Sequence, residues 1–183
     1  NHPPNKFTSE YDSVWGNIAI NIDGQEIIHR DNNIKYLHIK SSTFYRKLSK
    51  ELKINKIKIK MNQNIREIVK NKDDYTIISN KKRYKGRLIF DSRPDFYNVN
   101  SGYLYQHFYG VEVNFKDALL DQNKVILMDF QNFKNGINFF YILPFSKKKA
   151  LFETTYFSSK VLKEKEYKKE IKKYLKANYP EIG

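Results

Sequence analysis

The 183-residue sequence contains no cysteine. Disulfide bonds, thiol nucleophiles and cysteine metal sites are therefore excluded, and the composition fits a reducing compartment. No apolar run is near the length of about 18 residues that a membrane-spanning helix needs. The N-terminus also lacks the apolar core of a signal peptide. Any membrane contact is therefore expected to be peripheral.

Several short functional motifs are also missing. The seven glycines are scattered, so neither a dinucleotide-binding cluster nor a P-loop is present. There is no G-x-S-x-G, which leaves hydrolase chemistry without support. The histidines show no metal-ligand spacing, so no metal site is expected; they are His2, His29, His38 and His107. His107 lies in an aromatic strand and either lines a pocket or is a hydrogen-bonded core or edge residue.

The charge is strongly one-sided, with a formal net charge of +14. Such a charge would normally suggest a nucleic acid or an anionic membrane as partner. However, the excess is mostly lysine and accompanies abundant Asn, Ile, Tyr and Phe, a mixture typical of an AT-rich genome. Lys56 and Lys58 alternate with Ile57 and Ile59, as on the solvated face of a strand. We therefore favour solvated surface over nucleic-acid binding, which stays as the alternative from another functional class.

The length corresponds to one domain or to a large piece of a longer protein. The first residue is Asn1, and Gly183 directly follows a helical segment, so we expect a piece of a longer polypeptide. A 40% share of hydrophobic residues is enough to build a core, which argues against disorder.

The hydrophobic pattern predicts an α+β fold, mainly antiparallel sheet with few helices. Asp23 and Gly24 predict a tight turn between strands at residues 17–22 and 25–30. Further strands are expected over residues 54–61, 65–69, 75–78, 83–85, 87–91, 103–115, 125–130 and 138–145, and around Glu153. Apolar stripes at four-residue spacing predict one helix from residue 41 to about 52, and an amphipathic helix over residues 161–178 closes the chain.

Glu153 is the strongest candidate for a functional residue. It lies in the segment 139–157, FFYILPFSKKKALFETTYF, which predicts two strands joined by a tri-lysine turn. Apolar and threonine side chains occupy both faces of its strand, so the carboxyl is expected to be buried. A buried carboxyl keeps its proton to higher pH and can then donate it to a weakly basic substrate. The alternative is a carboxylate that caps the turn or pairs with a lysine such as Lys148.

Two other segments carry candidate polar groups. RLIFDSRP reads as a buried strand that ends in Asp91, Ser92 and Arg93, where sheets commonly place ligand contacts. In YLYQHFYGVEV, a period of two puts Gln106, Phe108, Gly110 and Glu112 on one face. Glu112 is thus a second acid of interest, with a solvated carboxylate as the alternative.

Four segments taken in order resemble the flavin-dependent lycopene cyclases: RLIFDSRP, YLYQHFYGVEV, VILMDF and FFYILPFSKKKALFETTYFS. Upstream, WGNIAINIDGQEI and YLHIKSSTFYRKL resemble the strand pair and helix of that family in weaker form, so the likeness covers nearly the whole chain. The resemblance implies the middle part of an FAD-dependent monooxygenase-like fold of the glutathione-reductase type, without its two FAD-binding ends. It divides the chain into a cofactor-side portion at about 17–95, a substrate-side antiparallel sheet at about 96–160 and a helix at 161–178.

The same resemblance implies lycopene β-cyclase activity, in which an acid cyclises the ends of lycopene without redox change. Glu153 falls on the essential first acid of a signature written Phe-Leu-Glu-Glu-Thr, with Glu112 as a second catalytic candidate. Asp91, Ser92 and Arg93 are expected near the cofactor. The implied substrate contacts are Gln106, Phe108, Tyr109, Phe145, Phe152 and Tyr156.

The implied cofactors are reduced FAD and NADPH as its reductant, and the implied substrates are lycopene and other linear carotenoids. A cytoplasmic bacterial protein, peripheral on the inner face of the membrane, is expected, with the isolated piece inactive. Two positions depart from the family pattern: the second signature acid is Thr154, and Thr43 stands where flavin-binding relatives often carry arginine. A flavoprotein of the same fold that acts on another isoprenoid is the nearest alternative.

Overall fold

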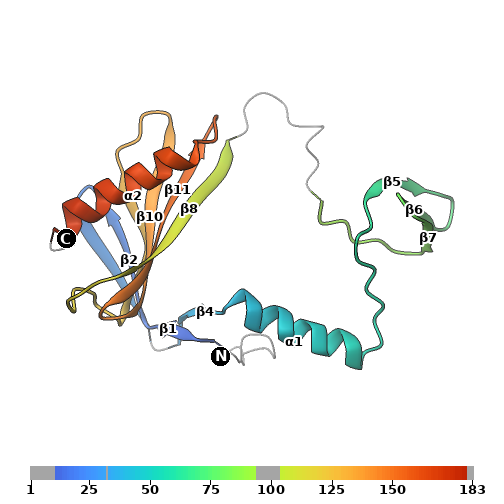
Figure 1. Cartoon of the computed structure of the whole chain (residues 1–183), viewed down its shortest axis with the longest axis horizontal. Coiled ribbons are helices and arrows are strands. Elements are labelled where there is room, and N and C mark those ends of the chain that lie inside the picture. Colours follow the sequence, from blue (N-terminus) through green and yellow to red (C-terminus); the bar gives the residue numbers. More distant parts are fainter. Residues whose placement is uncertain (1–10, 32, 94–103, 181–183) are drawn as a thin grey trace. The chain divides into compact units, whose positions relative to one another are not determined.

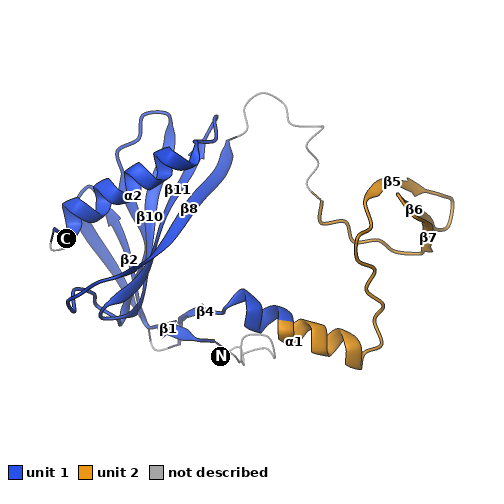
Figure 2. Cartoon of the chain, in the orientation of Figure 1, with its two compact units in different colours: residues 1–45, 100–183 blue, residues 46–99 orange. Residues whose placement is uncertain are grey.

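The computed structural model describes residues 11–31, 33–93 and 104–180. The chain divides into two compact units, which are described separately (Figure 2). The first unit comprises residues 1–45 and 100–183, and the second comprises residues 46–99.

The first unit is built on a six-stranded sheet in the order β3-β2-β9-β10-β11-β8 (Figure 1). Its strands are β2 Asn17–Ile22, β3 Gln25–Arg30, β8 Tyr105–Asn114, β9 Lys124–Gln131, β10 Gly136–Ser146 and β11 Lys149–Ser158. All neighbouring strands are antiparallel except β2 and β9. The prediction of an α+β fold with a mainly antiparallel sheet is confirmed. Asp23 and Gly24 both have positive φ, as the predicted tight turn requires.

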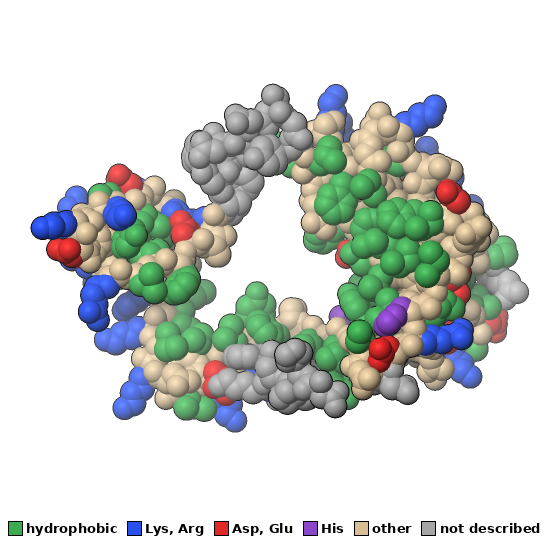
Figure 3. Space-filling view, turned by 180° about the vertical axis from the view of Figure 1, so that it is seen from behind, with side chains coloured by type: hydrophobic (Ala, Val, Ile, Leu, Met, Phe, Trp, Pro, Cys, Tyr) green, Lys and Arg blue, Asp and Glu red, His purple; other side chains and the backbone are tan. Residues whose placement is uncertain are grey.

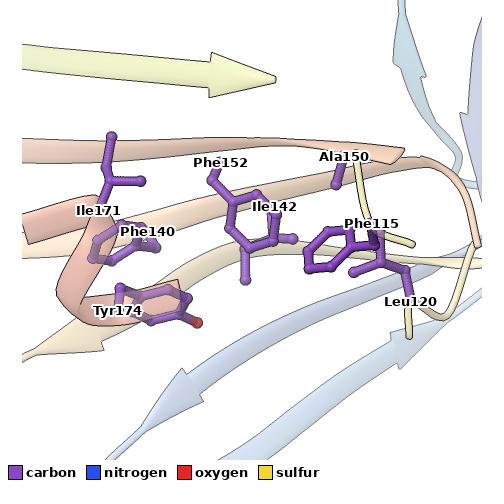
Figure 4. Packing of buried hydrophobic residues seen from close by; sticks show 8 residues of the cluster. All are labelled: Phe115, Leu120, Phe140, Ile142, Ala150, Phe152, Ile171 and Tyr174. Carbon is purple, nitrogen blue, oxygen red and sulfur yellow. The ribbon is translucent and has the colours of Figure 1, made fainter. Parts of the chain in front are cut away.

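Helix α2, Glu164–Asn178, covers one face of this sheet (Figure 1). It forms because its apolar residues recur at helical spacing and because the Glu166 carboxylate accepts a hydrogen bond from the Lys163 N–H at its start. Tyr174 stacks on Phe140 with ring centroids 3.9 Å apart. The resulting core is shown in Figure 4 and consists of Phe115, Leu120, Phe140, Ile142, Ala150, Phe152, Ile171 and Tyr174.

A buried polar network also joins α2 to the sheet. The Ser158 hydroxyl donates to Lys160 O at 2.7 Å, so the His107 Nε2–H donates to Ser158 Oγ at 2.8 Å. The Tyr167 hydroxyl donates to His107 Nδ1 at 2.5 Å. Both ring nitrogens are therefore satisfied, and burial lowers the pKa of the imidazole. His107 is a hydrogen-bonded core residue, as one of the two interpretations of the sequence expected.

The opposite face of the sheet carries a two-stranded ribbon made of β1, Ser13–Trp15, and β4, Tyr36–His38. Trp15 anchors it because its ring packs with Val125 and Leu143 of the sheet. The indole Nε1–H also donates to Pro144 O at 3.1 Å. The ribbon is thereby fixed on the sheet face that α2 does not cover.

The second unit contains an antiparallel sheet of three strands, which are β5 Ile65–Lys70, β6 Tyr75–Ser79 and β7 Arg83–Gly86. The Ser79 and Tyr84 hydroxyls both donate to Gln63 Oε1, at 3.1 and 3.0 Å. Helix α1, Ser41–Ile54, begins in the first unit and continues into the second, and its predicted extent is confirmed.

Two predicted strands are wrong. Residues 55–61 are not a strand, because α1 ends in a Schellman-type turn: Lys56 has φ 54°, and the Ile57 N–H donates to Leu52 O at 2.9 Å. Residues 87–91 are not a buried strand either, since Leu88 and Phe90 are 71% and 91% exposed. Their apolar composition gave the right residue types for a strand, but no described strand pairs with them. Residue 103 of the predicted strand 103–115 lies outside the described residues, as does His2.

Candidate functional site

Glu153 lies near the middle of β11, on the sheet face that α2 does not cover. Successive strand residues point to opposite faces, and Phe152 belongs to the core beneath α2. The Glu153 side chain is half-buried rather than fully enclosed. The strand was expected to be buried on both faces. Phe152 on one face is fully buried, whereas Glu153 on the other face is only half-buried.

The immediate partners of Glu153 come from both neighbouring strands. Its register partners are Tyr141 on β10 and Gly110 on β8. Thr155, two residues along β11, donates a long hydrogen bond of 3.4 Å to Glu153 Oε1. Burial raises the pKa of Glu153, and the Thr155 hydrogen bond lowers it by less. The Lys148 ammonium instead donates to Lys116 O at 2.5 Å, so the alternative of a Glu153–Lys148 pair is not observed.

Two tyrosines next to Glu153 were missed by the sequence analysis. Burial raises the pKa of Tyr36 and of Tyr141, and the nearby Glu153 carboxyl raises both further. Counting outward from the Ser146–Lys149 pair would bring Ile142 opposite Glu153, and only the register shift between Pro144 and Ser146 brings Tyr141 there. Tyr36 is delivered by the β1–β4 ribbon, and no local pattern in the sequence indicates that.

Many of the other side chains on this face are aromatic. Phe139 lies within 5.6 Å of Phe130, 5.2 Å of Tyr141 and 6.3 Å of Phe157, measured between ring centroids. Phe108 pairs with Thr155 across β8 and β11 and is 59% exposed. Figure 3 shows apolar side chains gathered over the first unit in this view. The acid therefore opens onto a surface that suits an apolar ligand rather than an ionic one.

The predicted grouping along β8 is confirmed by its register. Gln106, Phe108, Gly110 and Glu112 pair with every second residue of β11 from Phe157 back to Leu151, so they share the Glu153 face. Phe145 packs at the Trp15 end of the same face, where their ring centroids are 6.3 Å apart.

The other three predicted substrate contacts lie on the opposite face. Tyr109 stacks on Tyr167 of α2 with centroids 5.9 Å apart, and Phe152 and Tyr156 are buried beneath that helix. Their aromatic character serves the core between sheet and helix. Tyr109, Phe152 and Tyr156 are therefore not among the groups that a ligand beside Glu153 would meet, because odd and even positions of a strand diverge.

Glu112 on β8 pairs with Leu151, two residues before Glu153 on β11. Its pKa is shifted in the opposite direction to that of Glu153. Its carboxylate forms an ion pair with the Lys149 ammonium, in which Oε2 lies 2.5 Å from Nζ. This hydrogen bond, more than any other cause, lowers the pKa of Glu112, whose side chain is 55% exposed. Glu112 thus stays ionised where Glu153 tends to keep its proton.

Glu112 also lines a pocket of about 490 Å³ in the first unit. The pocket is lined by Asp12, Ser13, His38, Lys40, Ser41, Ser42, Glu112, Phe145 and Lys149. The start of α1 contributes its first two serines, and the first turn of α1 holds no acidic residue. Asp12 accepts hydrogen bonds from the Lys40 N–H at 3.0 Å and interacts with His38 Nδ1 at 2.9 Å. Hydroxyl groups, lysine ammonium groups and the carboxylates of Asp12 and Glu112 thus line a space beside the aromatic face.

Comparison with known proteins assigns the chain to a family. A family model described as "Lycopene cyclase protein" matches residues 4–182. The chain belongs to the lycopene cyclase family. No functionally curated protein matches it significantly.

The fold is also similar to that of a solved enzyme. The halogenase PltM in complex with phloroglucinol and FAD is 16% identical, with a TM-score of 0.61 over 93% of this chain and 40% of the halogenase. A second PltM structure, with ethyl mercury and mercury, gives 15% identity and a TM-score of 0.63 over 97% and 42%. This lycopene cyclase family chain thus spans about 40% of the length of the halogenase. The expected fold is confirmed, since this mainly antiparallel α+β arrangement matches part of an FAD-binding enzyme.

The family signature places its second acid at position 154, and the structure shows what that position does in this lycopene cyclase family member. Thr154 is 0% exposed and points away from the Glu153 face. Its hydroxyl accepts a hydrogen bond from Asn138 Nδ2 at 3.0 Å. Position 154 therefore belongs to the core beneath α2 and not to the surface around Glu153.

The predicted cofactor contacts Asp91, Ser92 and Arg93 lie in the second unit and are exposed. Arg93 donates to Asp91 through Nε at 2.9 Å and through Nη2 at 2.8 Å, and these hydrogen bonds lower the pKa of Asp91 to about 2. Its Nη1 donates to Ile65 O at 2.9 Å. The guanidinium is thus largely occupied within its own unit, and its cofactor contact stays a prediction.

Two searches of the described part of the chain gave negative results. Neither helix there has the length and apolarity to cross a bilayer. Among the same residues, no three histidines or acids are grouped so that they could hold a metal ion.

Proposed function

We propose that this chain forms the substrate-side sheet and part of the cofactor side of a lycopene β-cyclase, which closes the ends of lycopene into β-ionone rings without net redox change. The observation that carries the proposal is Glu153: a half-buried carboxyl with a raised pKa that opens onto an aromatic sheet face. Family membership supports the reaction class.

In the proposed reaction, Glu153 donates its proton to the terminal double bond of lycopene. The π electrons form the new C–H bond as the O–H bond of the acid breaks, which leaves a tertiary cation. The next double bond attacks this cation and closes the ring, and loss of a different proton leaves the β-ionone double bond. An alkene is a very weak base, so the acid has to be protonated, shielded from water and close to the acceptor carbon. The apolar surroundings of Glu153 support the first two requirements.

The cation intermediate has no heteroatom that could accept a hydrogen bond. Aromatic faces can stabilise it instead, by about 0.5–2 kcal/mol for each contact. Tyr141 and Phe108 share the sheet face of Glu153 and are proposed for this role, with Gln106 and Phe145 further along the face. Glu112, held ionised by Lys149, is proposed as a fixed negative charge beside the site rather than as a proton donor.

We propose that the pocket beside Glu112 takes part of a flavin. Ser41 and Ser42 at the start of α1 offer hydroxyl groups, and Lys40 offers its ammonium, to a phosphate or to ribityl hydroxyls, while the Lys40 N–H is bound to Asp12. We propose that these residues contact FAD when it is bound. Reduced FAD, kept reduced by NADPH, would supply electron density that stabilises the cation.

We propose that the protein acts in the cytoplasm, peripherally on the inner face of a bacterial membrane. Lycopene is wholly apolar and resides in the bilayer, so the enzyme has to reach it there. The exposed side chains of Phe108 and Ile137, on the Glu153 face, support access from an apolar phase.

The test uses the complete natural polypeptide that carries this sequence, expressed in cells that accumulate lycopene. Conversion of lycopene to β-carotene or to a one-ringed product is expected, and Glu153→Gln should abolish it. Glu164→Gln is the matched control, since Glu164 is an exposed acid of α2 on the far side of the sheet. Retained cyclisation in Glu153→Gln would contradict the role of this acid, and conversion of another isoprenoid alone would assign the alternative substrate class.

A further inference from the structure

The side chain of Glu153 occupies space that a residue on the neighbouring strand would normally fill. Its register partner on β8 is Gly110. A Cβ atom added to Gly110 would lie 3.3 Å from Glu153 Oε2 and 3.2 Å from Leu151 Cδ1. It would also lie 3.5 Å from Glu153 Cβ. The carboxyl therefore leans over the glycine, against the backbone of β8.

The backbone gives no separate reason for a glycine at this position. Gly24 and Gly136 have positive φ, at 78° and 145°, which explains their residue type. Gly110 is not among the positive-φ residues and pairs in regular register along β8 and β11. A glycine inside a strand weakens the strand and usually marks a close approach of another group. Here the approaching groups are the Leu151 side chain and the carboxyl of Glu153, at nearly equal distances.

We propose that Gly110 is a positioning residue whose missing side chain lets the Glu153 carboxyl lie against the sheet, in the place and orientation that proton donation requires. This inference rests on the function proposed above. Gly110 itself does not touch the substrate. It acts by keeping Glu153 beside Leu151 and within reach of the Thr155 hydroxyl.

A methyl group at position 110 would push the carboxyl outward. The space toward β10 is limited by Tyr141, its other register partner, so the carboxyl would have to move away from the sheet and toward solvent. Two consequences follow. The acid would lose desolvation, which lowers its pKa toward the ordinary value. It would also shift by a few tenths of an ångström from its place beside the acceptor carbon, and rates are sensitive to such shifts because a misplacement of about 1 Å can cost about 100-fold.

The test is Gly110→Ala in the complete natural polypeptide, with Gly86→Ala as the matched control. Gly86 also lacks a positive φ, and its added Cβ would meet Leu88 O at an ordinary 3.5 Å. We expect Gly110→Ala to lower the rate of ring formation by about 10-fold or more. The thermal midpoint should not fall, because Ala restricts the unfolded chain more than Gly does. Gly86→Ala should leave the rate unchanged.

A second measurement is independent of activity. In the 183-residue chain with ¹³C-labelled glutamate, the Glu153 carboxyl is titrated by NMR, with Glu153→Gln to assign its signal. The proposal expects the pKa of Glu153 to fall in Gly110→Ala and not in Gly86→Ala. If the pKa falls although the unaltered protein does not cyclise lycopene, Gly110 still positions the acid and the proposed function fails. If lycopene is cyclised and Gly110→Ala changes neither rate nor pKa, the positioning role is overturned.

The contact with Leu151 provides the last control. Should Gly110→Ala unfold the protein or lower the rate by disturbing Leu151, the double variant Gly110→Ala/Leu151→Ala removes that contact and leaves the one with Glu153. A rate still low in the folded double variant supports the positioning of Glu153. Recovery of the rate would assign the effect to Leu151 and contradict the proposal.

Discussion

Tyr141 and Glu153 are direct partners across the hairpin of β10 and β11. Burial raises the pKa of both side chains, and the Glu153 carboxyl further raises that of the tyrosine. An acid that tends to keep its proton therefore lies beside an aromatic ring on one sheet face. This pairing joins the two requirements of a cation-forming reaction, a proton source and a π surface, within adjacent strands.

The ring of Tyr141, rather than its hydroxyl, should matter for turnover. We expect Tyr141→Phe to retain most of the cyclisation rate, since the π face is preserved. Tyr141→Leu should lower the rate by about 5- to 30-fold, which corresponds to about 1–2 kcal/mol of lost cation stabilisation. Product formation is measured by chromatography, with thermal unfolding to confirm that both variants fold. An equal loss in Tyr141→Phe and Tyr141→Leu would instead assign the role to the hydroxyl, which both variants lack.

The stability of the protein should depend on pH through Glu153. Its folded pKa is raised above the ordinary value of 4.5, so the contribution of this carboxyl to folding is fully present below about pH 4.5 and is lost as pH rises through the folded value. Glu153→Gln removes this titration. The variant should therefore gain stability relative to the unaltered chain as pH rises, which urea unfolding at a series of pH values will measure.

Glu112→Gln is the control, because its effect on stability should change with pH in the opposite direction. Lys149 lowers the pKa of Glu112, so this carboxylate contributes stability above its ordinary pKa and loses it as pH falls. Its contribution is expected to be small, because the pair is exposed to solvent. If the stability of the two variants changed with pH in the same way, the opposite pKa shifts of Glu112 and Glu153 would be contradicted.

The hydrophobic pattern predicted most strands of the first unit. One face of this sheet is buried beneath α2, so every second residue of a strand is apolar, and that alternation can be seen in the sequence. The same pattern failed at residues 87–91. An apolar run specifies a strand only if another strand pairs with it, and the run around Phe90 has no such partner among the described strands. Residues 55–61 failed for a local reason, the turn at Lys56 that ends α1.

The candidate site was predicted in part. Position parity grouped Phe108 and Glu112 on one face of β8, since parity is a local property of a strand, but only the register between β8 and β11 shows that this is the face of Glu153. Parity also placed Phe152 and Tyr156 on the face behind Glu153, although both were still predicted as substrate contacts. Tyr36 could not be predicted, because its place beside Glu153 depends on how the ribbon anchored by Trp15 packs on the sheet.

A second acid cannot be restored beside Glu153 by changing Thr154. This side chain is fully buried beneath α2 and hydrogen-bonded to Asn138. Thr154→Glu should destabilise the fold by about 3 kcal/mol or more, because a carboxyl would be buried without a partner. Thr154→Ser keeps the hydroxyl and serves as the control. Chemical unfolding measures both, and a stable, more active Thr154→Glu variant would contradict the placement of this residue in the core.

The ribbon that carries Tyr36 should depend on Trp15. Replacing it by Phe keeps an aromatic ring in the core but removes the donor to Pro144 O, which should cost about 1–3 kcal/mol of unfolding free energy. Because β1 pairs with β4 from Ser13 to Trp15, loosening Trp15 should also loosen Tyr36, its register partner. Hydrogen exchange should therefore become faster in β4 before it changes in β10 or β11. Val14→Ala, at a 44% exposed position of the same strand, is the control that should leave this exchange unaltered. Equal acceleration in all strands would mean that the ribbon unfolds only with the whole sheet, and Tyr36 would then be held by the sheet rather than by Trp15.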